Sequence, residues 1–491
     1  MKSLVSLGIL LCVASCNSIL GIQDLGESGG DGGGGDGGGG DGAGAIGTVR
    51  FLLVTPDIYE IDTGPATPAV AIYVVGGGKL LDATYGVVTP FVDLPASLTA
   101  VEIRSPNGAT LHATVAVTFD RRPVAGEHAT AVILGTLGAD VSALDAARVV
   151  AFNDAEFGAG PEPQVRVVHA IADRTGPLSY AVTYAGVEDA VREIGSFSVA
   201  TASEQLPGGI DTRVGFGQDV VNTRLSREVS FTLPAQAAGA NVLLVLGGRQ
   251  HEAVAGDDPG LTLHVVPVIG ASTRVRQDPA FLLTNFLVDW PGNPLEVKDA
   301  NDGTLLSVVS LARSTPMIVF QSPFAARTVI VEGVDNLAAF ILPGVPAGTR
   351  RYIALTGYMS PVAAQPAAGA MTVEVVEGND GLTHWAFIQA SPDPAVVDLG
   401  VHNAANESDL TIAAGLAFRT SLLVSSAPDE IDLMRISPAG GSPIATFAAG
   451  VSGRRQITVL SGVQTGGESL RVTTTSLDRW PWTIGNAIVG Q

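Results

Sequence analysis

Four aspartates stand at the same place in four similar stretches of this sequence. Each is the ninth residue of an apolar stretch that starts at Val49, Val165, Phe281 or Trp385. The four are Asp57, Asp173, Asp289 and Asp393. One aspartate after an apolar stretch means little, but four in one frame predict a repeated structural or binding role.

Two kinds of chemistry fit these carboxylates. Directly after a strand, an aspartate oxygen can accept a hydrogen bond from the backbone amide two residues on, which fixes the exit turn. The alternative is calcium, a hard cation that prefers oxygen ligands. Asp57 with Glu60 and Asp62, or Asp393 with Asp398, would supply such oxygens. We expect the turn role and keep the four aspartates as calcium candidates.

Other residue types give little support for catalysis or for a metal site. Seven histidines occur singly, without the i,i+2 or i,i+4 spacing that brings two ligands onto one metal. The Gly-x-Ser-x-Gly pattern occurs only at Gly26–Gly30 and Gly-x-Gly-x-x-Gly matches fall only inside the glycine tract, so neither has the strand and helix that a nucleophile elbow or a dinucleotide site needs. We therefore expect no enzyme, no catalytic residue and no metal, with calcium as the one cofactor left open.

Two tryptophans near the end of the chain are candidates for binding a sugar ring. Trp480 and Trp482 lie in the stretch RWPWTIG, and aromatic faces of this kind can stack on a glycan. A terminal strand that covers the last core is the commoner use of such residues. Glycan stacking stays the alternative.

The only two cysteines of the chain, Cys12 and Cys16, lie at the end of an apolar run from Leu4 to Val13. Lys2, the apolar run and the small residues after it make the three-part pattern of a secretory signal. The run is too short to span a bilayer. The sequence therefore predicts export.

The four residues Val13-Ala14-Ser15-Cys16 resemble a bacterial lipobox. The resemblance implies that residues 1–15 are a lipoprotein signal peptide and that Cys16 carries a diacylglycerol. Asn17, where an aspartate would retain a lipoprotein at the inner membrane, favours the outer membrane. Several acyl chains on one cysteine would anchor the protein stably to that membrane.

Residues 16–45 are predicted to be a flexible linker. From Gly29 to Gly44 the chain is almost entirely glycine, interrupted by Asp31, Asp36 and Asp41. Such a composition cannot bury enough apolar area to offset the entropy of ordering. The linker would separate the anchor from a folded body.

The composition of the chain favours an acidic, exported, all-β protein. A net charge of −21 disfavours nucleic acid as a partner. Short apolar runs rich in Val, Ala, Leu and Thr recur between Gly and Pro turns, which is typical of strands. We expect a monomer, bound to the membrane through the lipid on Cys16, with a surface protein or a glycan as the possible partner.

A second repeated marker divides the body of the chain. Strand-like runs end at Gly135, Gly247, Gly357 and Gly462, which lie 86, 82, 76 and 77 residues after the four stretch starts. About seven strands in each unit of roughly 100 residues predict immunoglobulin-like β-sandwiches. We assign unit 1 to residues 46–155, unit 2 to 156–270, a divergent unit 3 to 271–380 and unit 4 to 381–491. Whether unit 3 is a complete domain stays open.

The repeats resemble a bacterial extracellular family known as domain of unknown function 4397. The resemblance rests on VRFLLVTPD followed by VAIYVVGGG, VRVVHAIAD followed by YAVTY, and WAFIQASPDPAVVDLGVH. It implies secretion and tandem β domains, and it assigns no activity.

These patterns together predict a lipid-anchored cell-envelope protein, in the outer membrane, with tandem β-sandwich repeats. We expect a non-catalytic, structural or adhesive interaction role at the cell surface. The alternative is a carbohydrate-binding or calcium-dependent binding module. A hydrolytic enzyme would need acids from separate strands to converge.

Overall fold

The computed structural model describes most of the chain after residue 46. The chain divides into Met1–Ala43 and Gly44–Gln491, and every described residue lies in the second part. The described ranges are 47–61, 68–138, 146–174, 176–184, 187–195, 197–218, 220–221, 224–225, 228–249, 260–289, 295–299, 305–309, 317–320, 327–332, 338–342, 348–374, 383–403, 408–426, 433–448, 455–464, 469–477, 483–484 and 488–489.

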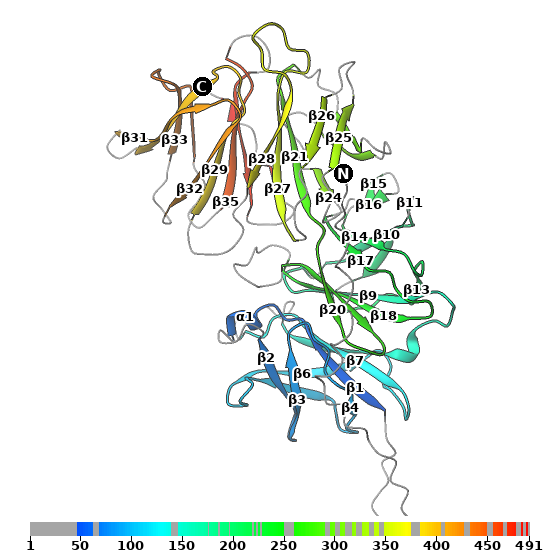
Figure 1. The fold of residues 1–491 in the computed structure, drawn as a ribbon. Coiled ribbons are helices and arrows are strands. Elements are labelled where there is room, and N and C mark those ends of the chain that lie inside the picture. Colours follow the sequence, from blue (N-terminus) through cyan, green and yellow to red (C-terminus); the bar gives the residue numbers. More distant parts are fainter. Residues whose placement is uncertain are drawn as a thin grey trace, which may run out of the picture. The chain divides into compact units, whose positions relative to one another are not determined.

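The predicted all-β class is confirmed. The described helical segments are α1 (Ile58–Ile61) and the 3-10 turn η1 (Asp154–Glu156). Neither of these segments is long or apolar enough to cross a membrane. All other regular elements are strands, which Figure 1 shows in sequence colours.

The first sandwich has eight described strands, in the order β3-β2-β5-β6-β8-β7-β1-β4. The strand β6 pairs with β5 on one side and in parallel with β8 on the other, so that the two layers are continuous at this edge. The strands are β1 (Thr48–Leu53), β2 (Ala69–Val74), β3 (Lys79–Thr84), β4 (Val92–Asp93), β5 (Ala100–Arg104), β6 (Leu111–Phe119), β7 (His128–Leu134) and β8 (Arg148–Asn153).

The second sandwich has sheets β11-β10-β14-β17 and β13-β9-β18-β19-β20, with β12 paired to β10. Its last strand, β20, extends the sheet to residue 276, beyond the boundary at residue 270 that we assigned from the repeats. The strands are β9 (Gln164–Ile171), β10 (Leu178–Tyr184), β11 (Val187–Glu188), β12 (Arg192–Gly195), β13 (Glu204–Gln205), β14 (Thr212–Gly217), β15 (Val220–Val221), β16 (Arg224–Leu225), β17 (Val229–Leu233), β18 (Asn241–Gly248), β19 (Thr262–Pro267) and β20 (Thr273–Arg276).

The third sandwich, which is the divergent unit of the sequence, has eight described strands. Its sheets are β24-β21-β27-β28 and β23-β22-β25-β26. The strands are β21 (Ala280–Leu287), β22 (Leu295–Asp299), β23 (Leu305–Val309), β24 (Met317–Phe320), β25 (Arg327–Glu332), β26 (Ala338–Leu342), β27 (Arg350–Gly357) and β28 (Gly369–Glu374).

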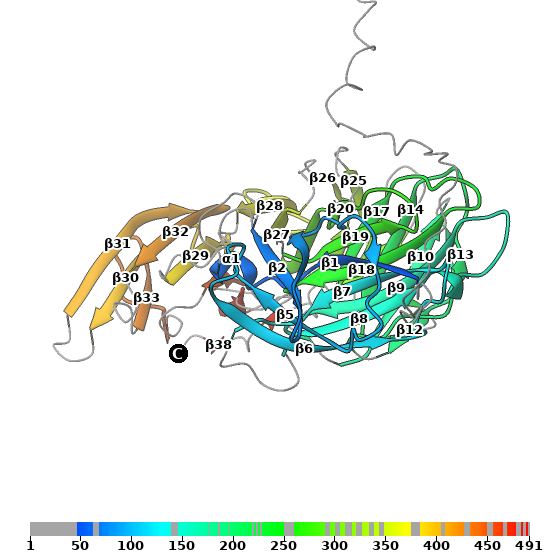
Figure 2. The same ribbon diagram turned by 90° about the horizontal axis from the view of Figure 1, so that it is seen from below.

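The fourth sandwich has sheets β32-β29-β35-β36-β37 and β31-β30-β33-β34, with β38 paired to β36. Figure 2 shows β31, β30 and β33 side by side in the second of these sheets. The strands are β29 (Thr383–Gln389), β30 (Val396–Asn403), β31 (Ser408–Ala417), β32 (Thr420–Ser426), β33 (Leu433–Pro438), β34 (Ala445–Ala448), β35 (Arg455–Ser461), β36 (Arg471–Ser476), β37 (Thr483–Ile484) and β38 (Ile488–Val489).

All four sandwiches share one topology. In each, the first strand pairs in parallel with the strand that ends at the second marker: β1 with β7, β9 with β18, β21 with β27 and β29 with β35. Counted in chain order within the third sandwich, the sheets run 4-1-7-8 and 3-2-5-6. The immunoglobulin-like label is not confirmed, because a constant-type immunoglobulin sandwich runs 1-2-5-4 and 3-6-7.

The second marker is a glycine because the backbone there is left-handed. The φ angles are 87° at Gly135, 99° at Gly248, 95° at Gly357 and 85° at Gly462. In the second sandwich the marker is therefore Gly248, one residue beyond the Gly247 that we assigned. A Cβ atom on Gly357 would lie 2.6 Å from the Ala367 carbonyl oxygen, so that a side chain there would clash as well as strain the backbone.

The first strands are buried on both faces, which explains why they read as continuous apolar runs. In β1, Val49 and Phe51 face the core of their own sandwich. On the opposite face, Leu52 and Val54 join a second core with Val168 of β9. Every residue of β9 and of β21 is buried. The outer face of the first strand therefore belongs to a joint between sandwiches.

Candidate functional site

The repeated aspartates close the loop that follows the marker glycine. Asp57 Oδ2 accepts hydrogen bonds from the amides of Leu137, at 2.6 Å, and Gly138, at 3.1 Å. In the third sandwich, Asp289 accepts from the amides of Met359 at 2.7 Å and Ser360 at 2.8 Å. In both cases the donors lie two and three residues after the marker glycine.

The parallel register explains this contact. Leu287, two residues before Asp289, lies opposite the marker Gly357, and Ile171 lies likewise opposite Gly248. Two residues further on, the aspartate therefore meets the loop that leaves the partner strand. We expected a donor two residues on, but the Tyr59 amide donates to the Pro56 carbonyl. After Asp289 the corresponding residue is Pro291, which has no N–H group.

The other two aspartates are described only in part. For Asp173, the corresponding loop residues 250 and 251 lie outside the described residues. The backbone oxygen of Asp393 accepts from the Gln464 amide at 2.9 Å. Asp398, its suggested calcium partner, uses its carboxylate on the amides of Gly415 at 2.8 Å and Gly440 at 3.1 Å.

Several sequence candidates lie outside the part of the chain that the structure describes. These are Cys16, Asp62, the side chain of Glu60, Trp480 and Trp482. Within the described ranges, no group of three or more His, Cys, Asp or Glu side chains is placed to hold a metal ion.

Burial raises the pKa of Asp57, while the Leu137 amide, the charge of Arg249 and the Gly138 amide oppose the shift. The carboxylate is 3% exposed, so that the two amides are its main compensation for lost water. The clamp formed by Asp57, Leu137 and Gly138 is therefore a buried and specific contact.

We expect Asp57→Ala to lower the free energy of unfolding by about 2 kcal/mol, because it leaves the buried Leu137 amide without an acceptor. Asp57→Asn keeps an acceptor oxygen and should cost less. The matched control is Asp82→Ala, which removes an exposed ion pair with Lys79 and should cost less than about 1 kcal/mol. Equal urea midpoints for Asp57→Ala and Asp82→Ala would contradict the clamp.

The joint between the first two sandwiches is built around two arginines at equivalent positions. Arg50 and Arg166 both stand seven residues before their repeated aspartate. Both lie on the strand face that turns toward the neighbouring sandwich, and they are 2% and 7% exposed. A buried guanidinium needs several acceptors because it always carries its charge.

Arg50 finds one acceptor in β7 of its own sandwich and two at the turn between β19 and β20. Its Nε donates to Thr130 Oγ1 at 3.1 Å and its Nη1 to the Gly270 carbonyl at 3.0 Å. Its Nη2 donates to the Pro267 carbonyl. The guanidinium carbon lies 4.8 Å from the centre of the Phe91 ring. Arg50 therefore ties β1 to a turn more than 200 residues away.

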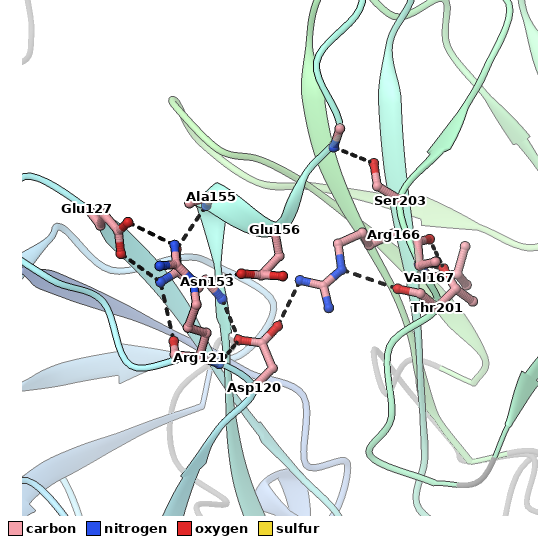
Figure 3. A network of polar contacts seen from close by, with 12 residues as sticks. Asp120, Arg121, Glu127, Asn153, Ala155, Glu156, Arg166, Val167, Thr201 and Ser203 are labelled. Carbon is pink, nitrogen blue, oxygen red and sulfur yellow. Dashed lines mark hydrogen bonds and ion pairs between the residues drawn. The ribbon is translucent and has the colours of Figure 1, made fainter.

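Arg166 makes the reverse contact, from β9 back to the first sandwich. Its Nη1 pairs with Asp120 Oδ2 at 2.9 Å and its Nε donates to the Thr201 carbonyl at 3.2 Å. Figure 3 shows its side chain between these two partners. The other oxygen of Asp120 accepts from the amides of Arg121 at 2.6 Å and Asn153 at 2.8 Å.

The network continues over the end of β8 toward solvent. Arg121 pairs with Glu127 at 2.8 Å and with Glu156 at 2.6 Å. Asn153 donates to Glu127 at 3.1 Å and accepts from the Ala155 amide at 2.8 Å, which caps η1. The Val124 amide, followed by Asn153 and Arg121, lowers the pKa of Glu127 to about 2. Glu127 therefore stays charged at neutral pH.

Burial shifts the pKa of two ionisable groups in the same region. Burial raises the pKa of Asp154 to about 7, with Arg50 and Arg166 opposing and Asp120 adding to the shift. Burial also lowers the pKa of His264 to about 3. Among the described residues neither ring nitrogen of His264 has a hydrogen-bond partner, although the Gly86 backbone lies beside the ring. We therefore expect the stability of this joint to depend on pH.

A second joint links the last two sandwiches. Arg419, in the turn between β31 and β32, donates from Nε to Thr356 Oγ1 and from Nη2 to the Thr356 carbonyl, both at 2.9 Å. It also donates to the Ala367 carbonyl. The turn residue has a φ of 61°, which is unusual for a residue with a side chain. Like Arg50, Arg419 reaches backbone carbonyls of a neighbouring sandwich.

Comparisons with known proteins add little to this geometry. No family model and no curated protein matches the chain. Among solved structures it is similar to the Bacillus anthracis TIE protein, with 9% identity, 83% of this chain and 67% of that chain covered, and a TM-score of 0.14. A likeness at this TM-score carries no argument about function. The resemblance to domain of unknown function 4397 stays a prediction.

None of Arg50, Arg166, His264 and Arg419 was a candidate from the sequence. Their partners lie in other sandwiches, and nothing local to each residue marks them. One signal was available for two of them, because Arg50 and Arg166 occupy the same position of the nine-residue repeat. A charged residue at the same position of two otherwise apolar strands predicts that both residues bind groups outside their own sandwich.

Proposed function

We propose that this chain is a lipid-anchored, non-catalytic protein of the bacterial cell envelope. Its tandem β-sandwiches serve as a structural or adhesive interaction module at the outer membrane. The observation that carries the proposal is the burial of β9 and β21 on both faces. The first strand of each such repeat packs one sandwich against the next. This arrangement suits a protein that holds its sandwiches at a distance from the membrane and presents them to a partner.

The polar chemistry of the described residues supports the same role. The two most deeply buried of the described arginines, Arg50 and Arg166, bind backbone carbonyls and a carboxylate at the joint. The charge of −21 suits solubility outside the cell. Lipid on Cys16 would hold the module at the membrane.

Fractionation of a two-membrane bacterium that makes the full chain tests this proposal. The wild type should incorporate labelled palmitate and sediment with the outer membrane. Cys16→Ala should lose both properties, whereas Cys12→Ala, the matched control, should keep them because Cys12 lies in the cleaved signal. Retention of the label and of membrane association by Cys16→Ala would contradict the anchor. Protease treatment of intact cells then reports whether the sandwiches face outward.

The alternative of a calcium-dependent or carbohydrate-binding module stays a prediction of the sequence. The carboxylates of Asp57 and Asp289 bind backbone amides, which explains their repetition without a cation.

A further inference from the structure

One edge strand of the fourth sandwich differs from its counterparts in the other three. In each sandwich a strand pairs antiparallel with the first strand and ends its sheet: β4, β13, β24 and β32. Their lengths are two, two, four and seven residues. The shortest two each contain an acidic residue, Asp93 and Glu204. Short and charged edges are the usual protection against pairing with another chain.

β32 lacks this protection. Its seven residues, TSLLVSS, contain no charge and no proline. They pair with β29 without a bulge from Thr420 to Ser426, so that the backbone is regular along the whole edge. No described strand pairs with its other side. Alternate N–H and C=O groups of a regular edge point outward and are ready to bind a further strand.

The side chains along this edge are apolar and incompletely covered. Leu423 is 50% exposed. Leu422 and Val424 pack against the core that holds Trp385, yet both are only partly buried. A strand added beside β32 would cover all three.

The order of residue types in β32 identifies the strand that fits. In an antiparallel pair centred on Leu423, this leucine faces itself, Leu422 faces Val424, and Ser421 faces Ser425. Apolar residues then meet apolar residues and hydroxyls meet hydroxyls, which are the favourable cross-strand pairs. Because β32 carries no charge, two chains that are each strongly acidic meet there without like charges in contact.

We propose that β32 is a homodimer interface, at which the strand pairs antiparallel with β32 of a second copy about a two-fold axis at Leu423. The interface is isologous, and the sheet of β36, β35, β29 and β32 continues into the partner. This assembly goes beyond the proposed function and departs from the monomer that we expected from the sequence.

Cysteine cross-linking tests the register directly, in full chains with Cys12→Ser and Cys16→Ser. Residues that face each other in an antiparallel pair lie within disulfide range. With glutathione disulfide as oxidant, Leu423→Cys should give a covalent dimer. Ser421→Cys alone should stay monomeric on a non-reducing gel, and a mixture of Ser421→Cys with Ser425→Cys chains should cross-link. Failure of Leu423→Cys, or equal cross-linking by Ser421→Cys alone, would overturn the proposal.

Light scattering of the wild-type full chain in detergent provides the second readout. The wild type should have the mass of a dimer. Leu423→Lys places two like charges opposite each other and should weaken dimerisation at least about tenfold. Leu410→Lys, at a residue of β31 that is 71% exposed, is the matched control and should remain dimeric. A monomeric wild type would overturn the proposed interface. So would a Leu423→Lys variant that has the same mass as Leu410→Lys and the same melting temperature as the wild type.

Discussion

Replacement of Arg50 by alanine should lower the free energy of unfolding by about 3–5 kcal/mol. The change removes three hydrogen bonds and leaves the carbonyls of Pro267 and Gly270 without their donor. It also removes the stacking on Phe91. Urea denaturation followed by fluorescence measures the difference.

The control for Arg50→Ala is Arg121→Ala, from the same joint. The Arg121 side chain is 42% exposed and its two ion pairs lie toward solvent. Exposed pairs are worth less than about 1 kcal/mol. If Arg50→Ala and Arg121→Ala lower the free energy of unfolding by the same small amount, Arg50 does not stabilise the joint.

Acidification from pH 7.5 to pH 5 should destabilise the protein through His264. Its pKa is about 3 in the folded chain, because burial lowers it, and about 6.5 when unfolded. Below pH 6.5 the unfolded chain therefore binds the proton and the folded chain does not. The stability that His264 contributes is present above pH 6.5 and is lost as the pH falls toward 3. By pH 5 the loss is about 2 kcal/mol.

His264→Leu should remove this part of the pH dependence. Two other buried groups also contribute to the pH dependence. His169, whose pKa burial lowers to about 4, acts in the same direction. Asp154, whose pKa burial raises to about 7, acts in the opposite direction, because the folded chain then binds the proton first. An unchanged slope in His264→Leu would show that the ring is hydrated in the folded chain.

The sequence predicted the repeat frame and the β class because both depend on local patterns. The apolar stretch, the aspartate at its ninth position and the later glycine each reflect one strand and its exit. Even the divergent third sandwich follows the frame, with Asp289 bound to the loop after Gly357. The recurrence of the aspartate and the later glycine in all four repeats also indicates that the aspartate contacts the loop after that glycine.

The joints could not be predicted in this way. A continuous apolar run in β9 indicates burial on both faces, but it does not say what covers the second face. The contact of Arg50 with Pro267 joins residues 217 positions apart. Likewise His264 is a single histidine in an apolar strand, and only the packing of Tyr85 and Gly86 around it reveals its isolation.

Hydrogen exchange of the full chain tests most directly the central claim, that neighbouring sandwiches form one structural unit through the outer faces of their first strands. Amides of β1 and β9 should open with the same free energy and the same urea dependence. Arg50→Ala should lower both opening free energies equally, although the substitution lies only in the first sandwich. Faster exchange in β1 with unchanged exchange in β9 would contradict the claim, because the two sandwiches would then unfold independently.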